Sequence, residues 1–253
     1  MHTLSATELI TIWERGTGNT PVEQALAMLG AAFPETPREI LAKLDVAQRD
    51  AFLLRLRSLT FGTHFRGLTT CQACGQQLEL DLNTNDLAFS NPLLPDVEMM
   101  NLASPESVFQ LENYEVVFRL PNSIDLQALE SQKHGPAARG QLLEACILLT
   151  RHGEQQIAPS EVPSNVLDAL IDHMSQVASL ADLTVSVNCP ACGHTWEILF
   201  DIVSFFWAEI SAWAARLVRE VHILAMAYGW READILTMSS FRRRQYLELI
   251  GAR

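Results

Sequence analysis

The sequence lacks the local motifs by which several enzyme classes are recognised. It contains no Gly-x-Ser-x-Gly nucleophile elbow, no Gly-x4-Gly-Lys phosphate loop and no Gly-x-Gly-x-x-Gly dinucleotide turn. Its seven histidines are scattered singly, and no two of them stand four residues apart as zinc-binding histidines on a helix do. We therefore assign no catalytic residue and expect a protein that is not an enzyme.

Basic residues are also scarce. Eighteen lysines and arginines stand against thirty aspartates and glutamates, a formal net charge of −12, which repels nucleic acid and anionic lipid unless the basic residues cluster. The first residues have neither the basic start nor the apolar stretch of a signal peptide. Ionisable residues interrupt the most apolar region, 198–230, too often for a membrane span. We expect a cytoplasmic protein without membrane contact, in which this region is a long helix.

The composition predicts a globular, mainly helical α+β fold. Hydrophobic residues make up 48% of the 253 positions and charged residues 19%, enough apolar surface to form a core. Thr20-Pro21-Val22-Glu23 and Thr36-Pro37-Arg38-Glu39 have the capping pattern of helix starts. Apolar spacing predicts helices in the first 60 residues and at 124–130, 137–150, 166–180, 202–228, 231–236 and 241–250. Strands are expected at 77–82, 183–187 and 195–200, and a short hairpin at 108–120.

Four of the five cysteines form two matching motifs. These are Cys71-Gln-Ala-Cys74-Gly75 and Cys189-Pro-Ala-Cys192-Gly193, each followed by strand patterning. A Cys-x-x-Cys-Gly turn directs both sulfurs to one point, because glycine permits the tight loop after the second cysteine. Two such knuckles predict a tetrahedral Zn²⁺ site with Cys71, Cys74, Cys189 and Cys192 as ligands. Because four thiolates close the coordination shell, the zinc would be structural rather than catalytic.

Other interpretations of the cysteines are weaker. A thioredoxin-like redox pair usually opens a helix, whereas both motifs precede strands. His194 could replace one of the sulfurs, and a metalloenzyme would need an open ligand position that the four-cysteine set does not leave. Cys146 lies in an apolar helical pattern and is interpreted as a small buried hydrophobe.

The two knuckles are far apart in the sequence. The 114 residues between Cys74 and Cys189 greatly exceed the roughly 15 to 20 of a compact ribbon, so they form a large insertion whose ends the zinc would hold together. Between residues 76 and 132, ten carboxylates stand against Arg119 alone, which makes the insertion a candidate partner surface. The predicted division is a helical region 1–66, a first knuckle and strand 67–82, an acidic insert 83–182, a second knuckle with strands 183–200, and C-terminal helices 201–253.

The C-terminal region holds two further candidates. Arg242-Arg243-Arg244 lies on a predicted helix whose Phe241, Tyr246, Leu247 and Ile250 would dock on the body. The arginines could bind phosphate, form surface ion pairs or contact an acidic partner. The preceding long helix is rich in large apolar residues, and it could be wholly core or expose part of its aromatic face to a partner helix.

Taken together, these segments resemble a known family. The segments that carry the resemblance are Ile12-Trp13-Glu14-Arg15-Gly16, Pro21-Val22-Glu23-Gln24-Ala25-Leu26, residues 50–57, the two cysteine knuckles, residues 228–236 and residues 242–249. They are similar to the baseplate hub assembly proteins, or chaperones, of T-even-like phages with contractile tails and of phage-tail-like contractile injection systems. The resemblance spans nearly the whole chain and is weakest in the acidic insert.

The resemblance implies assembly rather than catalysis. It implies a permanent baseplate component or an assembly factor that contacts baseplate or hub proteins, located in the cytoplasm of the bacterial host during assembly or in the finished tail. The alternative is a zinc-ribbon nucleic-acid-binding or transcription-related module that uses Arg242 to Arg244. Such a module would bind with a steep dependence on salt. The oligomeric state does not follow from the sequence.

Overall fold

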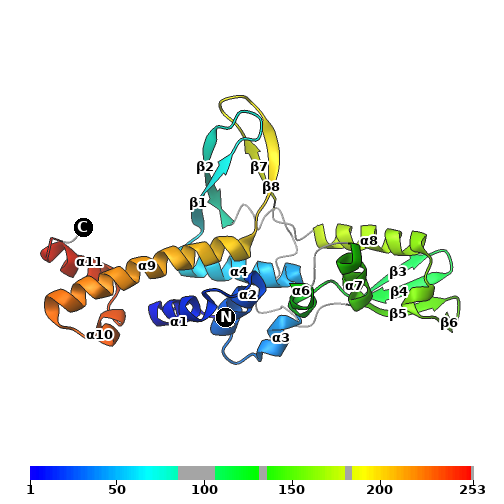
Figure 1. Ribbon diagram of the computed structural model, residues 1–253, viewed down its shortest axis with the longest axis horizontal. Coiled ribbons are helices and arrows are strands. Elements are labelled where there is room, and N and C mark those ends of the chain that lie inside the picture. The colour runs from blue at the N-terminus through cyan, green and yellow to red at the C-terminus, as the bar shows by residue number, and fades with distance from the viewer. Residues whose placement is uncertain (85–105, 131–135, 180–183, 252–253) are drawn as a thin grey trace.

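A computed structural model of the chain describes residues 1–84, 106–130, 136–179 and 184–251. It confirms an α+β fold that is mainly α. The molecule is elongated (Figure 1), with a helical body in the middle, an arm of two hairpins above it, and separate groups of elements at its two ends. Within the described ranges, none of the helices combines the length and apolar character that a membrane span requires.

The helical body is built from the first four helices and the start of α9. The predicted helix start at Thr20 is confirmed, because Thr20 caps the second helix, and Ser5 and Glu8 form a reciprocal capping box at the first. The predicted cap at Thr36 is wrong, because Pro37 is the cap residue of the third helix and no side chain accepts a hydrogen bond there. Leu26, Leu53 and Phe206 are among the fully buried side chains of the core. The helices are α1 (Ala6–Gly16), α2 (Pro21–Ala32), α3 (Arg38–Ala42) and α4 (Val46–Phe61).

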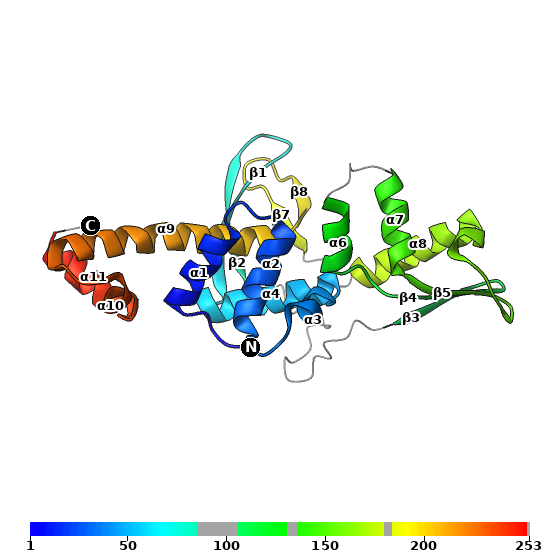
Figure 2. The ribbon, with the colours of Figure 1, turned by 60° about the horizontal axis from the view of Figure 1, so that its bottom comes forward.

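Helix α9 (Ile202–Tyr228) joins the body to the C-terminal end of the molecule. Its first half packs into the body core through Ile202, Phe206 and Ile210. The Trp207 ring lies against Gly16, where an added Cβ would come within 2.5 Å of a ring carbon. Two views (Figures 1 and 2) show the second half running past the body. The apolar helix is therefore core along its first half.

The arm consists of two antiparallel hairpins. Strands β1 (His64–Thr70) and β2 (Gln77–Asn83) form one two-stranded sheet, and β7 (Thr184–Asn188) and β8 (Thr195–Leu199) form another. The strands predicted at 77–82 and 195–200 are present with slightly different ends, and Leu183 of the third lies outside the described residues. The two hairpins rise side by side from the body (Figure 1), although residues 84–183 separate them in the chain.

The insert is a small sheet covered by helices on one face. Buried residues of β4, α7 and α8 form its core, including Phe118, Cys146 and Leu170. The strands lie in the order β3-β4-β5-β6 and are all antiparallel. Its elements are β3 (Ser107–Leu111), β4 (Tyr114–Phe118), α6 (Ser123–Glu130), α7 (Pro136–Cys146), β5 (Ile147–His152), β6 (Gln155–Gln156), the 3₁₀ turn Pro159–Glu161 and α8 (Ser164–Ser179).

The helix predicted at 137–150 is wrong in its last four residues, 147–150. Helix α7 ends at Cys146, and β5 starts at Ile147 and pairs with β4, where Val117 faces Leu149 and Val116 faces Thr150. A short apolar run such as Ile147 to Leu149 fits the period of a helix and that of a strand. Only pairing with the neighbouring strand decides that this run is a strand. The predicted short hairpin is therefore half of a four-stranded sheet.

The C-terminal projection, residues 216–251, contains α10 (Glu232–Leu236) and α11 (Ser240–Leu249) packed on the end of α9. The predicted docking face of α11 is partly wrong, because Phe241 is 70% exposed whereas Arg243 is buried. The Arg243 Nε donates to a Glu220 carboxylate oxygen at 2.9 Å, and its Nη1 donates to the Met238 carbonyl. Tyr246 packs inward against the Tyr228 and Trp230 rings. Hydrophobic periodicity predicted that Phe241 would be buried. The buried side chain of this helix is instead Arg243, whose guanidinium has hydrogen-bond partners.

Candidate metal centre

The two cysteine motifs form turns of the same geometry at the tips of the arm hairpins. In the first turn, the Cys71 N–H donates to the Gln76 carbonyl at 2.9 Å and the Gly75 N–H donates to the Cys71 carbonyl at 2.9 Å. In the second turn, Cys189 bonds to the His194 carbonyl at 2.9 Å and Gly193 to the Cys189 carbonyl at 2.8 Å. The predicted internal duplication is therefore also a duplication of backbone structure.

Each turn needs its glycine. Gly75 and Gly193 both have φ of +74°, a left-handed conformation that other L-residues rarely adopt. This conformation reverses the chain directly after the second cysteine and leads it into β2 or β8. The glycine of each motif is thus a backbone requirement of the turn.

The turns bring four sulfurs together from two distant parts of the chain. The ligand atoms of Cys71, Cys74, Cys189 and Cys192 all lie within 4.8 Å of one another. The Cys71 and Cys192 sulfurs are 3.7 Å apart, and the Cys74 and Cys189 sulfurs are also 3.7 Å apart. A tetrahedral ion with metal–sulfur bonds of about 2.3 Å needs sulfurs about 3.8 Å apart. The arrangement is therefore compatible with a metal site.

The site is half buried. Cys71 and Cys189, the first cysteine of each turn, are buried, whereas Cys74 and Cys192 are exposed. Burial would raise the pKa of the Cys71 thiol, but hydrogen bonds from the backbone N–H groups of Cys74 and Ala73, with help from neighbouring thiols, lower that pKa to about 7. Backbone N–H groups aimed at a sulfur favour its thiolate form, which is the form that binds metals.

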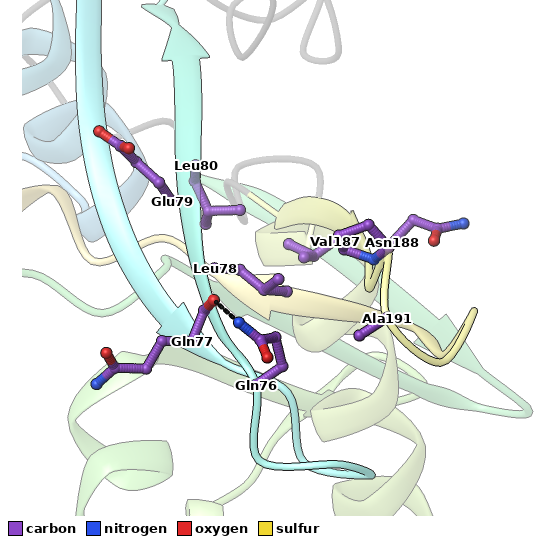
Figure 3. Close-up of a pocket in the computed structure, with 9 residues that line it drawn as sticks. Gln76, Gln77, Leu78, Glu79, Leu80, Val187, Asn188 and Ala191 are labelled. Atoms are coloured by element: carbon purple, nitrogen blue, oxygen red, sulfur yellow. Dashed lines mark hydrogen bonds between the residues drawn. The ribbon is translucent and has the colours of Figure 1, made fainter.

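Little hydrophobic core supports these turns. The buried residues around the sulfurs are Leu78 of β2 and Val187 of β7, with Leu80, Val185, Trp196 and Ile198 partly buried beside them. A cavity of about 620 Å³ runs along β2 next to the second turn (Figure 3). Two-stranded hairpins are marginally stable in water without further support. The four-sulfur cluster thus belongs to a small apolar core.

The base of the arm is anchored by Arg57, which sequence reasoning missed. Its side chain is 2% exposed, and its Nε and Nη2 donate to the two Glu209 carboxylate oxygens of α9 at 2.8 and 2.7 Å. It also donates to the carbonyls of Gly62 and His64, at the start of β1, and its guanidinium lies 4.7 Å from the Phe65 ring centre. The available signal was the pair of charges inside two apolar helix patterns, Arg57 among leucines and Glu209 among aromatic residues.

The remaining sequence candidates do not join the four sulfurs as ligands. His194 is not in the group of possible metal ligands found in the described part of the chain, and its ring stacks on Trp196 with ring centres 5.4 Å apart. Cys146 is fully buried in the insert, where burial raises its pKa to about 11. Of the three consecutive arginines, Arg242 and Arg244 are exposed and Arg243 is the buried partner of Glu220.

Comparison with known proteins decides the family. The profile of the family described as T4 bacteriophage base plate protein matches residues 9–207, which include the body, the insert and both halves of the arm. The chain belongs to this family. The expected resemblance to T-even baseplate proteins is thereby confirmed. No curated protein and no solved structure matches the chain. Membership implies a structural or assembly role for the baseplate protein in the tail, with contacts to other baseplate proteins.

Proposed function

We propose that this baseplate protein is a non-catalytic structural part or assembly factor of a contractile tail, and that it acts through protein contacts presented by a zinc-stabilised arm. The observation that carries the proposal is the meeting of Cys71, Cys74, Cys189 and Cys192, from opposite ends of a long insertion, at distances that suit one tetrahedral ion. The family match supports the baseplate context.

Zinc is the ion that suits these ligands best. Four thiolates on two matching turns are the ligand set of structural zinc sites, and they leave no position for water or substrate. The ion would neutralise sulfurs that otherwise repel one another as thiolates, and it would tie β1–β2 to β7–β8 where few apolar side chains do so. It would also hold both ends of the insert, residues 83–182, in place relative to the body.

Assembly factor and permanent component differ in where the protein ends up. A transient factor is present in the host cytoplasm and absent from finished tails, whereas a component remains in the particle. Quantitative mass spectrometry of purified tails and of assembly intermediates separates the two. Absence of the protein from tails, baseplates and every intermediate would contradict the whole proposal.

The metal is tested on the purified full-length protein. Elemental analysis is expected to find one zinc per chain, and Cys74→Ser or Cys192→Ser is expected to lower that content while Cys146→Ser leaves it unchanged. Equal zinc content in all variants would contradict the assignment of the ligands.

The nucleic-acid alternative gains no support from the arginine cluster. Arg243 is buried and paired with Glu220, so only two of the three guanidinium groups reach solvent. Two exposed cations beside a chain of net charge −12 are a weak phosphate-binding surface. A mobility shift with duplex DNA at low salt, compared between the wild type and the triple alanine variant, checks this directly.

A further inference from the structure

One edge of the arm has backbone groups available for another strand. Strand β2 has a single hydrogen-bonded neighbour, β1, among the described residues. Because the Cys71 N–H bonds to the Gln76 carbonyl, the antiparallel alternation directs the N–H and C=O groups of Gln77, Glu79 and Asp81 away from β1. The Gln76 side-chain amide donates to the outward Gln77 carbonyl at 3.1 Å, as this alternation requires.

A cavity lies directly along this edge. It measures about 620 Å³ and is lined by the consecutive residues 76–80 of β2, with Val187, Asn188, Pro190 and Ala191 on the opposite side. Figure 3 shows Leu78 and Leu80 pointing toward Val187 and Ala191, whereas Gln77 and Glu79 point to the other side of β2. Leu78 and Val187 are buried next to it, so the inner side of the opening is apolar. A lining of consecutive residues means that the strand edge itself borders the cavity.

The outer face of the same strand is acidic. Glu79 and Asp81 are exposed, and alternate with the inward Leu78 and Leu80. Arg66 of β1 lies 3.6 Å from a Glu79 carboxylate oxygen, whereas Asp81 forms no ion pair within the described ranges. A strand added next to β2 would place alternate side chains over the cavity and beside these carboxylates.

We propose that the free edge of β2 binds an extended segment of a partner protein by strand addition. The segment has apolar residues, which enter the cavity beside Leu78 and Val187, alternating with lysine or arginine residues, which lie beside Glu79 and Asp81. A second copy of β2 is a poor occupant, because an antiparallel pair of these edges would bring the acidic side chains of both copies together. The proposal names the partner chemistry of the arm and rests on the proposed function only in that the protein acts through protein contacts.

A proline substitution tests the edge without removing a hydrogen bond of the hairpin. The Glu79 N–H points away from β1, so Glu79→Pro removes an outward donor and blocks strand addition. Leu68→Pro is the matched control, because Leu68 is directly opposite Glu79 and its N–H faces the other edge of the hairpin. Glu79→Gln removes the charge and keeps the donor.

The probes are synthetic peptides chosen from a random library of about ten residues, a length that covers one strand, selected on the purified full-length protein with its metal bound. The selected peptides are expected to alternate apolar and basic residues and to slow amide exchange at Glu79 and Asp81. Glu79→Pro is expected to weaken their binding roughly tenfold or more, Glu79→Gln only about threefold, and Leu68→Pro not at all.

Several results would overturn the proposal. These are a selection without alternating peptides, binding that is equal in Glu79→Pro and Leu68→Pro, or a dimer of the wild-type protein that Glu79→Pro dissociates, which would give the edge to a second copy. If Glu79→Pro loses its metal or its melting transition, Ala191→Trp fills the cavity from the opposite side and is expected to weaken binding in the same way. Unchanged binding in a folded Ala191→Trp variant then contradicts the proposal.

Failure of this proposal can be told from failure of the function. Tails that incorporate the Glu79→Pro protein in normal amount, together with unchanged peptide binding, would disprove strand addition and leave the baseplate role intact. Absence of the wild-type protein from tails and intermediates would disprove the role whatever the peptides do.

Discussion

The helical body and the arm are stabilised in different ways. Among the described residues, the core cluster of the body holds twenty-one buried hydrophobic residues, one of which is Phe65 of β1, whereas the cluster around the sulfurs holds four, and two of these are Cys71 and Cys189. Burial of large apolar side chains contributes roughly 1.5 to 3 kcal/mol each, so apolar packing can supply most of the stability of the body. The arm has too little packing for that and presents four thiols instead. The comparison indicates that metal removal and core mutations should affect separate parts of the molecule.

Metal removal is the strongest test of this difference. Chelation, or Cys189→Ser, is expected to unfold the arm and to lower the melting temperature, because structural zinc contributes about 10 to 16 kcal/mol in zinc-finger peptides. Amide exchange is expected to become fast at residues 64–83 and 184–199 and to stay slow in α2 and α4. Cys146→Ala, which removes a buried thiol outside the cluster, is the control. Slow exchange in the arm of the metal-free protein would show that packing suffices.

Truncation of a core side chain should destabilise the body and leave the metal site of the arm intact. Phe206→Ala removes a fully buried ring from the body and is expected to lower the free energy of unfolding by about 4 kcal/mol while the zinc content stays the same. Phe241→Ala removes a phenyl ring that is 70% exposed, and it is expected to change the free energy of unfolding by less than about 0.5 kcal/mol. Urea unfolding measures both. Similar losses in the two variants would contradict the placement of the core.

The junction between the two regions depends on Arg57. Arg57→Met is expected to cost about 3 kcal/mol, because it leaves the partly buried Glu209 carboxylate and two carbonyls at the arm base without their donor. Arg151→Met breaks an exposed ion pair with Glu115 and is expected to cost under about 1 kcal/mol. Amide exchange of β1 in Arg57→Met reports whether the arm loosens at its base. An Arg57→Met protein as stable as wild type would rule out the anchor.

The smallest effect concerns pH. Asp45 caps α4, and burial raises its pKa above the ordinary 3.8 although backbone N–H groups of Gln48 and Ala47 lower it. A carboxyl whose folded pKa is raised contributes stability that is complete below pH 3.8 and is lost as the pH rises through the folded value. Asp45→Asn keeps a capping oxygen without the charge, so stability at pH 7 is expected to stay within about 1 kcal/mol of wild type. If the stability of Asp45→Asn fell between pH 4 and 7 by as much as that of the wild type, the role of Asp45 would be contradicted.

Sequence reasoning succeeded where the physical signal is local. The helix predicted at about 202–228 has these bounds in the structure, because a long apolar run ends at Gly229, which takes the left-handed conformation. The two turns were predicted from spacing and glycine alone. It failed at 147–150, where pairing with β4 makes the segment a strand instead of a helix. It also failed at α11, where Arg243 is buried and Phe241 is exposed. Both failures involve groups whose partners are distant in the sequence.

By itself, the sequence determined the helical class of the fold, the two equivalent cysteine turns and the acidity of the insert, because each depends on residues close together in the chain. The matching cysteine turns also predicted that the two turns meet, and the structure brings their four sulfurs together. Only the tertiary structure decided that Arg57 ties the arm to α9 and that the edge of β2 borders a cavity. These features join segments more than a hundred residues apart, or depend on which backbone groups face outward. Such contacts form only when the whole chain is packed, so a local pattern of residues does not predict them.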